Sequence, residues 1–154
     1  MSWVNFDGLE VKFNRERAEA PVDGVTNAKE RMLVVDLPDA TALTDTDTAA
    51  VAGDTAFIPA GSIITKAVFV ADTAFTTSAS GTLDIGFKQA AGTNIDDDGI
   101  DQAVAAAALA IRQGVICDGA MIGDKLQYDS YVMFTYDTGA FTAGAGRLFV
   151  SYIV

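Results

Sequence analysis

A short acidic segment in the second half of the chain carries the side chains that most resemble a chemical site. Asn94, Asp96 and Asp98 stand at alternate positions and Gly99 follows them, which is similar to the first half of a calcium-binding loop. The twelfth position of such a loop requires a bidentate Glu, and here it is Ala105. Asn94, Asp96 and Asp98 are therefore a calcium candidate. The alternative that we favour is an acidic turn at the start of a helix, with no metal and no cofactor.

The usual catalytic groups are missing from the sequence. The chain of 154 residues has no histidine, which excludes Ser-His-Asp and Cys-His arrangements and histidine metal sites. Its single cysteine, Cys117, lies in an apolar run, so we expect a buried thiol that serves as a small hydrophobic residue. Neither glycine-rich phosphate motif, GxxxxGK[ST] or GxGxxG, occurs. The sequence therefore predicts a protein that binds and is not an enzyme.

The net charge of the chain restricts the kinds of partner that it can bind. The formal net charge is -11, and the lack of basic excess argues against binding to nucleic acid or to an anionic membrane surface. The longest apolar run, from Ala103 to Ile111, has nine residues, far fewer than a membrane-spanning helix needs. We therefore expect neither a nucleic acid nor a membrane as partner.

The negative charge is unevenly distributed along the chain. Residues 1–31 hold five basic and six acidic residues, whereas residues 32–154 hold five basic and fifteen acidic residues. One interpretation is that solvated charge simply fell this way. The other is that the nearly neutral first segment docks on an acidic partner.

The expected secondary structure also divides the chain into residues 1–31 and residues 32–154. In residues 1–31, loosely alternating apolar residues flank Asp7-Gly8, which predicts a hairpin followed by an extended arm. Residues 32–154 predict a β-sandwich body. Its expected strands are those with alternating or β-branched residues, at 30–37, 62–72, 82–87, 126–136 and 147–154 among others.

The spacing of strands and turns predicts the fold class. Roughly eight strands with a turn signal about every ten residues are typical of an all-β, antiparallel β-sandwich or jelly roll. The alanine-rich stretch near residues 100–112 predicts one short inserted helix, because alanine has the highest helix propensity. Cys117 follows this stretch in an expected strand.

Six short motifs follow one another along nearly the whole chain. They are Trp3-Val4-Asn5-x-Asp7-Gly8-Leu9-x-Val11-Lys12-Phe13, Phe57-Ile58-Pro59-Ala60-Gly61-Ser62-Ile63-Ile64, Thr82-Leu83-Asp84-Ile85-Gly86-Phe87, Asp96-x-Asp98-Gly99-Ile100-Asp101, Ala120-Met121-Ile122-Gly123 and Ala143-Gly144-x-Gly146-Arg147-Leu148-x-Val150-x-Tyr152. In this order they resemble small virion structural proteins of tailed phages from marine and freshwater bacteria, cyanophages included.

The resemblance implies a head decoration (cement) protein with a jelly-roll or β-sandwich fold. Such a protein would bind the major capsid protein on the capsid exterior, would form a homotrimer, and would stabilise the shell. Under this hypothesis the contact with the capsid or with a neighbouring subunit would involve Trp3, Phe6, Lys12, Arg15 and Arg17. Two alternatives stay open, which are another virion component of the tail or fibre, and a carbohydrate-binding β-sandwich.

Overall fold

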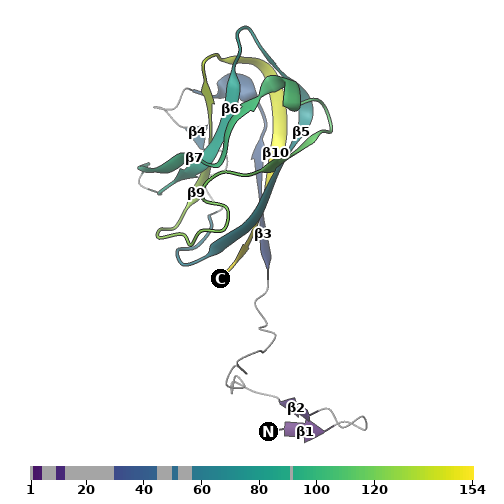
Figure 1. Cartoon of the computed structure of the whole chain (residues 1–154), viewed down its shortest axis with the longest axis vertical. Helices are drawn as coiled ribbons and strands as arrows, with labels where there is room; N and C mark the ends of the chain where they lie inside the picture. Colours follow the sequence, from purple (N-terminus) through teal and green to yellow (C-terminus); the bar gives the residue numbers. More distant parts are fainter. Residues whose placement is uncertain (1, 5–9, 13–29, 45–49, 52–56, 91) are drawn as a thin grey trace.

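The sandwich predicted from alternating residues is present in the computed structural model of the chain (Figure 1). The structure describes residues 2–4, 10–12, 30–44, 50–51, 57–90 and 92–154. Two four-stranded sheets make up the body, and a separate two-stranded sheet joins β1 (Ser2–Val4) to β2 (Glu10–Lys12). β1 and β2 pair antiparallel, while the Asp7-Gly8 turn and the arm expected after the hairpin lie outside the described residues.

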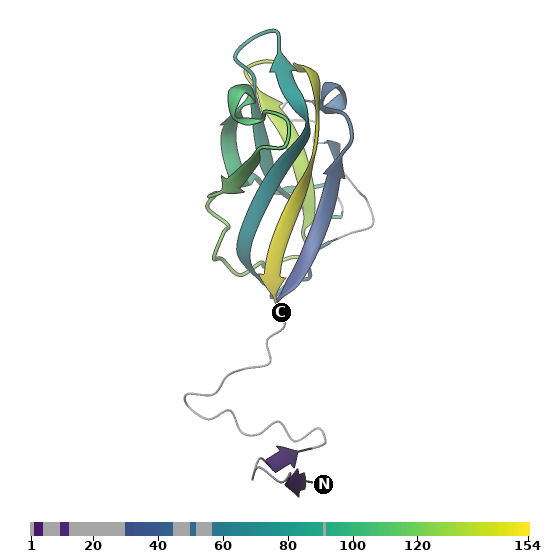
Figure 2. The same ribbon diagram turned by 90° about the vertical axis from the view of Figure 1, so that its right-hand side faces the viewer.

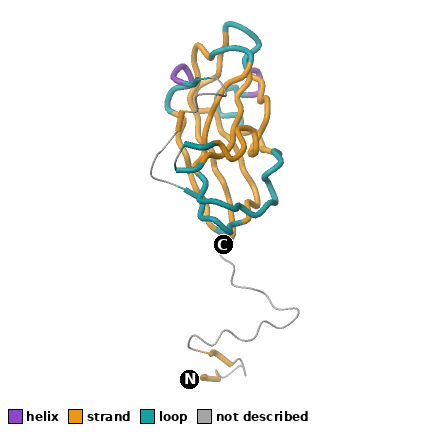
Figure 3. Tube along the Cα trace, turned by 90° about the vertical axis from the view of Figure 1, so that its left-hand side faces the viewer, coloured by secondary structure: helices purple, strands orange, loops and turns teal. Residues whose placement is uncertain are grey.

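The described residues of the body form eight strands and two short 3-10 turns. They are β3 (Arg31–Leu37), η1 (Ala40–Ala42), β4 (Ala50–Val51), β5 (Ile63–Thr77), β6 (Thr82–Lys88), β7 (Asn94–Ala105), η2 (Ala106–Ala108), β8 (Gly114–Cys117), β9 (Tyr131–Asp137) and β10 (Phe141–Ile153). Figure 3 shows how strands account for most of the body. No helix among the described residues is both long and apolar enough to cross a membrane.

The strand order identifies the sandwich as a jelly roll. The first sheet has the order β3-β10-β5-β8 and the second has the order β4-β9-β6-β7. Within these sheets β3 pairs with β10, β4 with β9, β5 with β8 and β6 with β7, all antiparallel. The first strand of the body thus pairs with the last, the second with the last but one, and so on to the central pair. This is the pairing of one long hairpin that is rolled up on itself. Figure 2 shows β3, β10 and β5 side by side in the first sheet.

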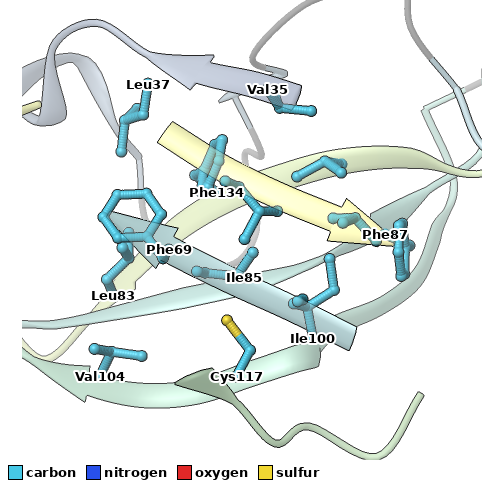
Figure 4. Packing of buried hydrophobic residues seen from close by; sticks show 14 of the residues in the cluster. Val35, Leu37, Phe69, Leu83, Ile85, Phe87, Ile100, Val104, Cys117 and Phe134 are labelled. Atoms are coloured by element: carbon cyan, nitrogen blue, oxygen red, sulfur yellow. The ribbon is translucent and has the colours of Figure 1, made fainter. Parts of the chain in front are cut away.

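The core fills the space between the two sheets. Leu83, Ile85 and Phe87 of β6 are fully buried, which confirms the face predicted from their alternation. Phe69 of β5, in the first sheet, has its ring centroid 6.0 Å from that of Phe134 of β9, in the second sheet. This edge-to-face pair joins the two layers (Figure 4) and contributes about 1 kcal/mol beyond the area it buries.

The helix expected near residues 100–112 is not formed, and this prediction was wrong. β7 runs through Ala105 in antiparallel pairing with β6, and only Ala106–Ala108 form a single 3-10 turn. Ile100 and Val104 are buried in the sandwich core. An alanine-rich stretch this short forms at most a marginal helix in isolation, so strand pairing and burial override its intrinsic propensity.

Candidate functional site

The acidic segment of the chain lies at the start of β7 and forms a wide bulge over β6. In the ladder between these strands, Phe87 pairs with Asp96 and Ile85 pairs with Asp101. Four residues of β7 therefore oppose the single residue Gly86 of β6. A side chain at Gly86 would overlap the carbonyl oxygen of Asp96, so the missing side chain makes room for the bulge.

The bulge brings part of the predicted calcium set together. The carboxylate oxygens of Asp96, Asp97 and Asp98 lie within 4.8 Å of one another. Burial raises the pKa of Asp96, and a hydrogen bond with Asp98 raises it further. Asn94 pairs with Lys88 in the ladder and is exposed. The segment does not begin a helix, so the capping role that we favoured is wrong.

This arrangement offers oxygen ligands of the kind that Ca²⁺ prefers, although fewer than its usual six to eight. Three carboxylates cluster, and Asp97 takes part although the spacing pattern had not selected it. Calcium binding by Asn94, Asp96 and Asp98 accordingly stays a prediction.

Two further aspartates are buried where β6, β7 and β8 meet. Asp84 and Asp101 are each 6% exposed. The Asp84 carboxylate accepts a hydrogen bond from the backbone N–H of Ala103 at 2.6 Å. Burial raises the pKa of both carboxyl groups, and neighbouring acids raise it further, among them Asp137 for Asp84 and Asp118 for Asp101. These carboxyl groups are therefore destabilised in their charged form.

The thiol of Cys117 is buried beside one of these acids, as the sequence predicted. Burial, followed by the charge of Asp101, raises the pKa of the Cys117 thiol to about 12. A thiol with this pKa is protonated at neutral pH and is a poor nucleophile. Cys117 packs as part of the hydrophobic core.

The outer face of the first sheet has a different character from the acidic region. Phe149 of β10 pairs with Val34 of β3 on one side and with Val68 of β5 on the other. Val68 in turn pairs with Ile116 of β8. We call these four residues the apolar belt, because they form one row across all four strands. Sequence analysis missed the belt, since its members are far apart in the chain and only the strand register brings them together.

The contact residues predicted in the first segment are only partly described. Trp3 lies in β1 and Lys12 in β2, within the two-stranded sheet where Trp3 pairs with Val11. Phe6, Arg15 and Arg17 lie outside the described residues. The contact role of all five residues therefore stays a prediction.

Neither a protein-family model nor a curated protein matches this chain. Its fold is similar to a chain in the solved capsid asymmetric unit of cyanophage Pam1, with a TM-score of 0.62 and 16% identity over 92% of this chain and 96% of that one. It is also similar to a chain in the solved capsid of Ralstonia phage GP4, with a TM-score of 0.54 and 17% identity over 87% of this chain and 89% of that one. At such low identity the likeness concerns the fold.

Proposed function

We propose that this chain is a structural component of a phage virion, namely a decoration (cement) protein that binds the outer surface of the capsid as a homotrimer. The observation that carries the proposal is the match over 92% of the chain to 96% of a chain from a phage capsid. Because nearly all of both chains is covered, the likeness extends to the whole jelly roll and is not limited to a shared sheet. Jelly rolls are also a recurrent architecture of viral capsid proteins.

The chemistry of the described residues supports a role in assembly. The thiol of Cys117 is protonated and buried, and the buried Asp84 accepts a hydrogen bond from the backbone. Buried groups of this kind stabilise or strain the fold, and they offer no reacting atom to a substrate. The motif order along the sequence, which resembles phage decoration proteins, supports the finer assignment to the capsid exterior.

Residues 1–31 are our proposed contact with the major capsid protein or with a neighbouring subunit. Their near-neutral charge allows this segment to approach a partner surface that would repel the acidic body, which has five basic and fifteen acidic residues. Trp3 and Phe6 would provide apolar contacts there, while Lys12, Arg15 and Arg17 would pair with carboxylates of the partner.

A reconstruction of the particle that contains this protein tests the assignment. We expect density for the jelly roll on the outer surface of the shell, at positions that allow three copies to meet. Density on the tail or on a fibre would contradict decoration and would favour the alternative virion role.

A truncation tests the contact segment. Deleting residues 1–20 should abolish binding to undecorated capsids, measured by co-sedimentation of purified protein with particles. The matched control is the full-length protein at the same concentration. Full occupancy by the truncated protein would show that the contact lies elsewhere.

A further inference from the structure

The apolar belt is the most unusual surface among the described residues. Its ends are its most open members, since Val34 is 46% exposed at the β3 edge and Ile116 is 71% exposed at the β8 edge. Met32, which is 63% exposed, extends the belt at the β3 end. Phe149 and Val68 occupy the two central strands between these ends.

A row of this kind requires a physical explanation. The outward positions of a sandwich strand usually carry polar residues, because this face meets water. Single exposed apolar residues are common on protein surfaces, whereas a contiguous apolar patch marks an interaction site. The belt is contiguous because each member pairs directly with the next across the ladder.

The charges around the belt suggest what covers it. Charged positions that alternate with the belt residues, on β3, β5 and β10 or directly before β3, are Glu30, Asp36, Lys66, Asp72 and Arg147, which are three acids and two bases. Arg147 and Asp72 also pair with each other at 2.8 Å. The net charge of these five positions is therefore -1, whereas the net charge of the whole chain is -11.

Part of the excess negative charge lies on the second sheet. Asp84, Asp101 and the Asp96–Asp98 cluster all belong to β6 and β7 of that sheet. Two copies of an acidic protein repel each other less when they approach through surfaces of low net charge. The belt face is such a surface, so it is the face through which copies of this chain can meet at the lowest electrostatic cost.

We propose that the belt is the contact between copies of this chain, with three belts facing a common three-fold axis. In a closed ring each copy needs one contact for each of its two neighbours. The belt provides these at opposite sheet edges, with Val34 and Met32 on β3 and Ile116 on β8. The β3 end of one copy would then pack against the β8 end of the next. This inference rests on the homotrimer of the proposed function and names its contact surface.

The mass of the full-length protein in solution tests the proposal, measured by light scattering or sedimentation equilibrium. The wild type should have the mass of a trimer, and Val34→Asp or Ile116→Asp should reduce it to that of a monomer. Both positions are exposed, so each variant should still be folded at the temperature of the mass measurement. A melting curve checks this for each variant.

Tyr128→Asp is the matched control, because Tyr128 is 50% exposed and lies outside the belt. It should keep the mass of the wild type. A belt variant that stays trimeric would overturn the proposal, and so would any other mass for the wild type.

A disulfide cross-link provides a second test, in which the proposal predicts a new covalent species and not the loss of the trimer. With Val34→Cys and Ile116→Cys combined, oxidation should join neighbouring copies into covalent trimers, while either single variant should not form them. Absence of covalent trimers from the double variant would overturn the head-to-tail arrangement of belts. A reconstruction that lacked this protein on the capsid would contradict the proposed function and would leave these solution tests unaffected.

Discussion

At the scale of single residues, buried aspartates are held where their charge is unfavourable. Asp84 is 6% exposed and keeps one defined partner, the backbone N–H of Ala103. On the neighbouring strand β9, Thr135 is its ladder partner and is fully buried, with no hydrogen-bond partner for its hydroxyl among the described residues. The polar groups on this side of the second sheet therefore contribute less to stability than their number suggests.

The substitution Asp84→Asn should stabilise the protein at neutral pH. An amide oxygen can still accept the hydrogen bond from Ala103, while the buried charge and its repulsion from Asp137 are removed. We expect a gain of about 1 kcal/mol in the free energy of unfolding at pH 7, measured by urea denaturation. A loss of stability would show that the carboxylate has a favourable partner.

The same carboxyl groups predict the direction of the pH dependence. Burial raises the folded-state pKa of Asp84, Asp96 and Asp101 above the ordinary value of 3.8, so the folded state binds these protons more tightly than the unfolded state does. Their contribution to stability is complete below the ordinary pKa and is lost as the pH rises through the raised values. The Asp84→Asn variant should therefore lose less stability than the wild type between about pH 4 and pH 7.

Asp39 is the matched control for this pH dependence. It accepts hydrogen bonds from the side chain and the backbone of Thr41, which lower its pKa. Its contribution has the opposite sign, because it is present above the ordinary pKa and is lost as the pH falls. Asp39→Asn should therefore lower stability at pH 7. If the unfolding free energy changed equally steeply with pH in the wild type and in Asp84→Asn, Asp84 would not be a source of the pH dependence.

At the scale of elements, the acidic segment and the strand beneath it form one unit. β7 bulges over Gly86, and the turn after β8 fastens the bulge through backbone hydrogen bonds from Gly119 to Ile100 and from Met121 to Gly99, each 2.8 Å long. A second register shift lies between Leu83 and Ile85, where two residues of β7, Gln102 and Ala103, oppose Asp84 of β6. The backbone N–H of Ala103 donates to the Asp84 carboxylate at this second bulge.

Several strands of the body could be predicted from the sequence, whereas the conformation of the alanine-rich stretch could not. The alternation at 30–37 and 82–87 corresponds to β3 and β6, because one face of each strand packs on the core. The composition of the alanine-rich stretch does not show, by alternation, which of its faces packs on the core. Its conformation is determined by the pairing of Leu83 with Val104 and by the burial of Ile100, and both depend on distant residues.

The bulge predicts a specific sensitivity at Gly86. A methyl group there would overlap the backbone of Asp96 and Asp97, so Gly86→Ala should lower the free energy of unfolding by about 2 kcal/mol or more. Gly114→Ala is the control, because a methyl group at Gly114 would meet its nearest atom, in Val68, at 3.7 Å. That change should stay within about 0.5 kcal/mol. Equal unfolding midpoints in urea for the two variants would argue against the tight bulge.

At the scale of the whole molecule, the roll closes through pairs that are distant in sequence. β3 and β10 are joined by seven residue pairs, from Gly146 with Leu37 to Tyr152 with Arg31. Alternation predicts that such strands exist, and the number of strands predicts a sandwich. Register between distant strands leaves no local signal, which is why the apolar belt could not be predicted while the buried face of β6 could.

The position of the core predicts that the body folds without the first residues. All buried apolar residues among those described lie between Val35 and Tyr152, and β3 is the first strand that pairs within the sandwich. Deleting residues 1–20 should therefore change the unfolding free energy by less than about 0.5 kcal/mol and Tm by about 2 °C at most. Thermal melting followed by circular dichroism measures both.

A longer deletion provides the contrast, because removing residues 1–37 would also remove β3. The buried Val35 and Leu37 would be lost, and β10 would be left with an unpaired edge. Losing two buried aliphatic residues costs several kcal/mol, which is a large part of the stability of a domain this size. We therefore expect no cooperative melting from this second variant. If the shorter deletion also melted without cooperativity, the first segment would belong to the folding unit, and its loss of capsid binding could no longer be assigned to a missing contact.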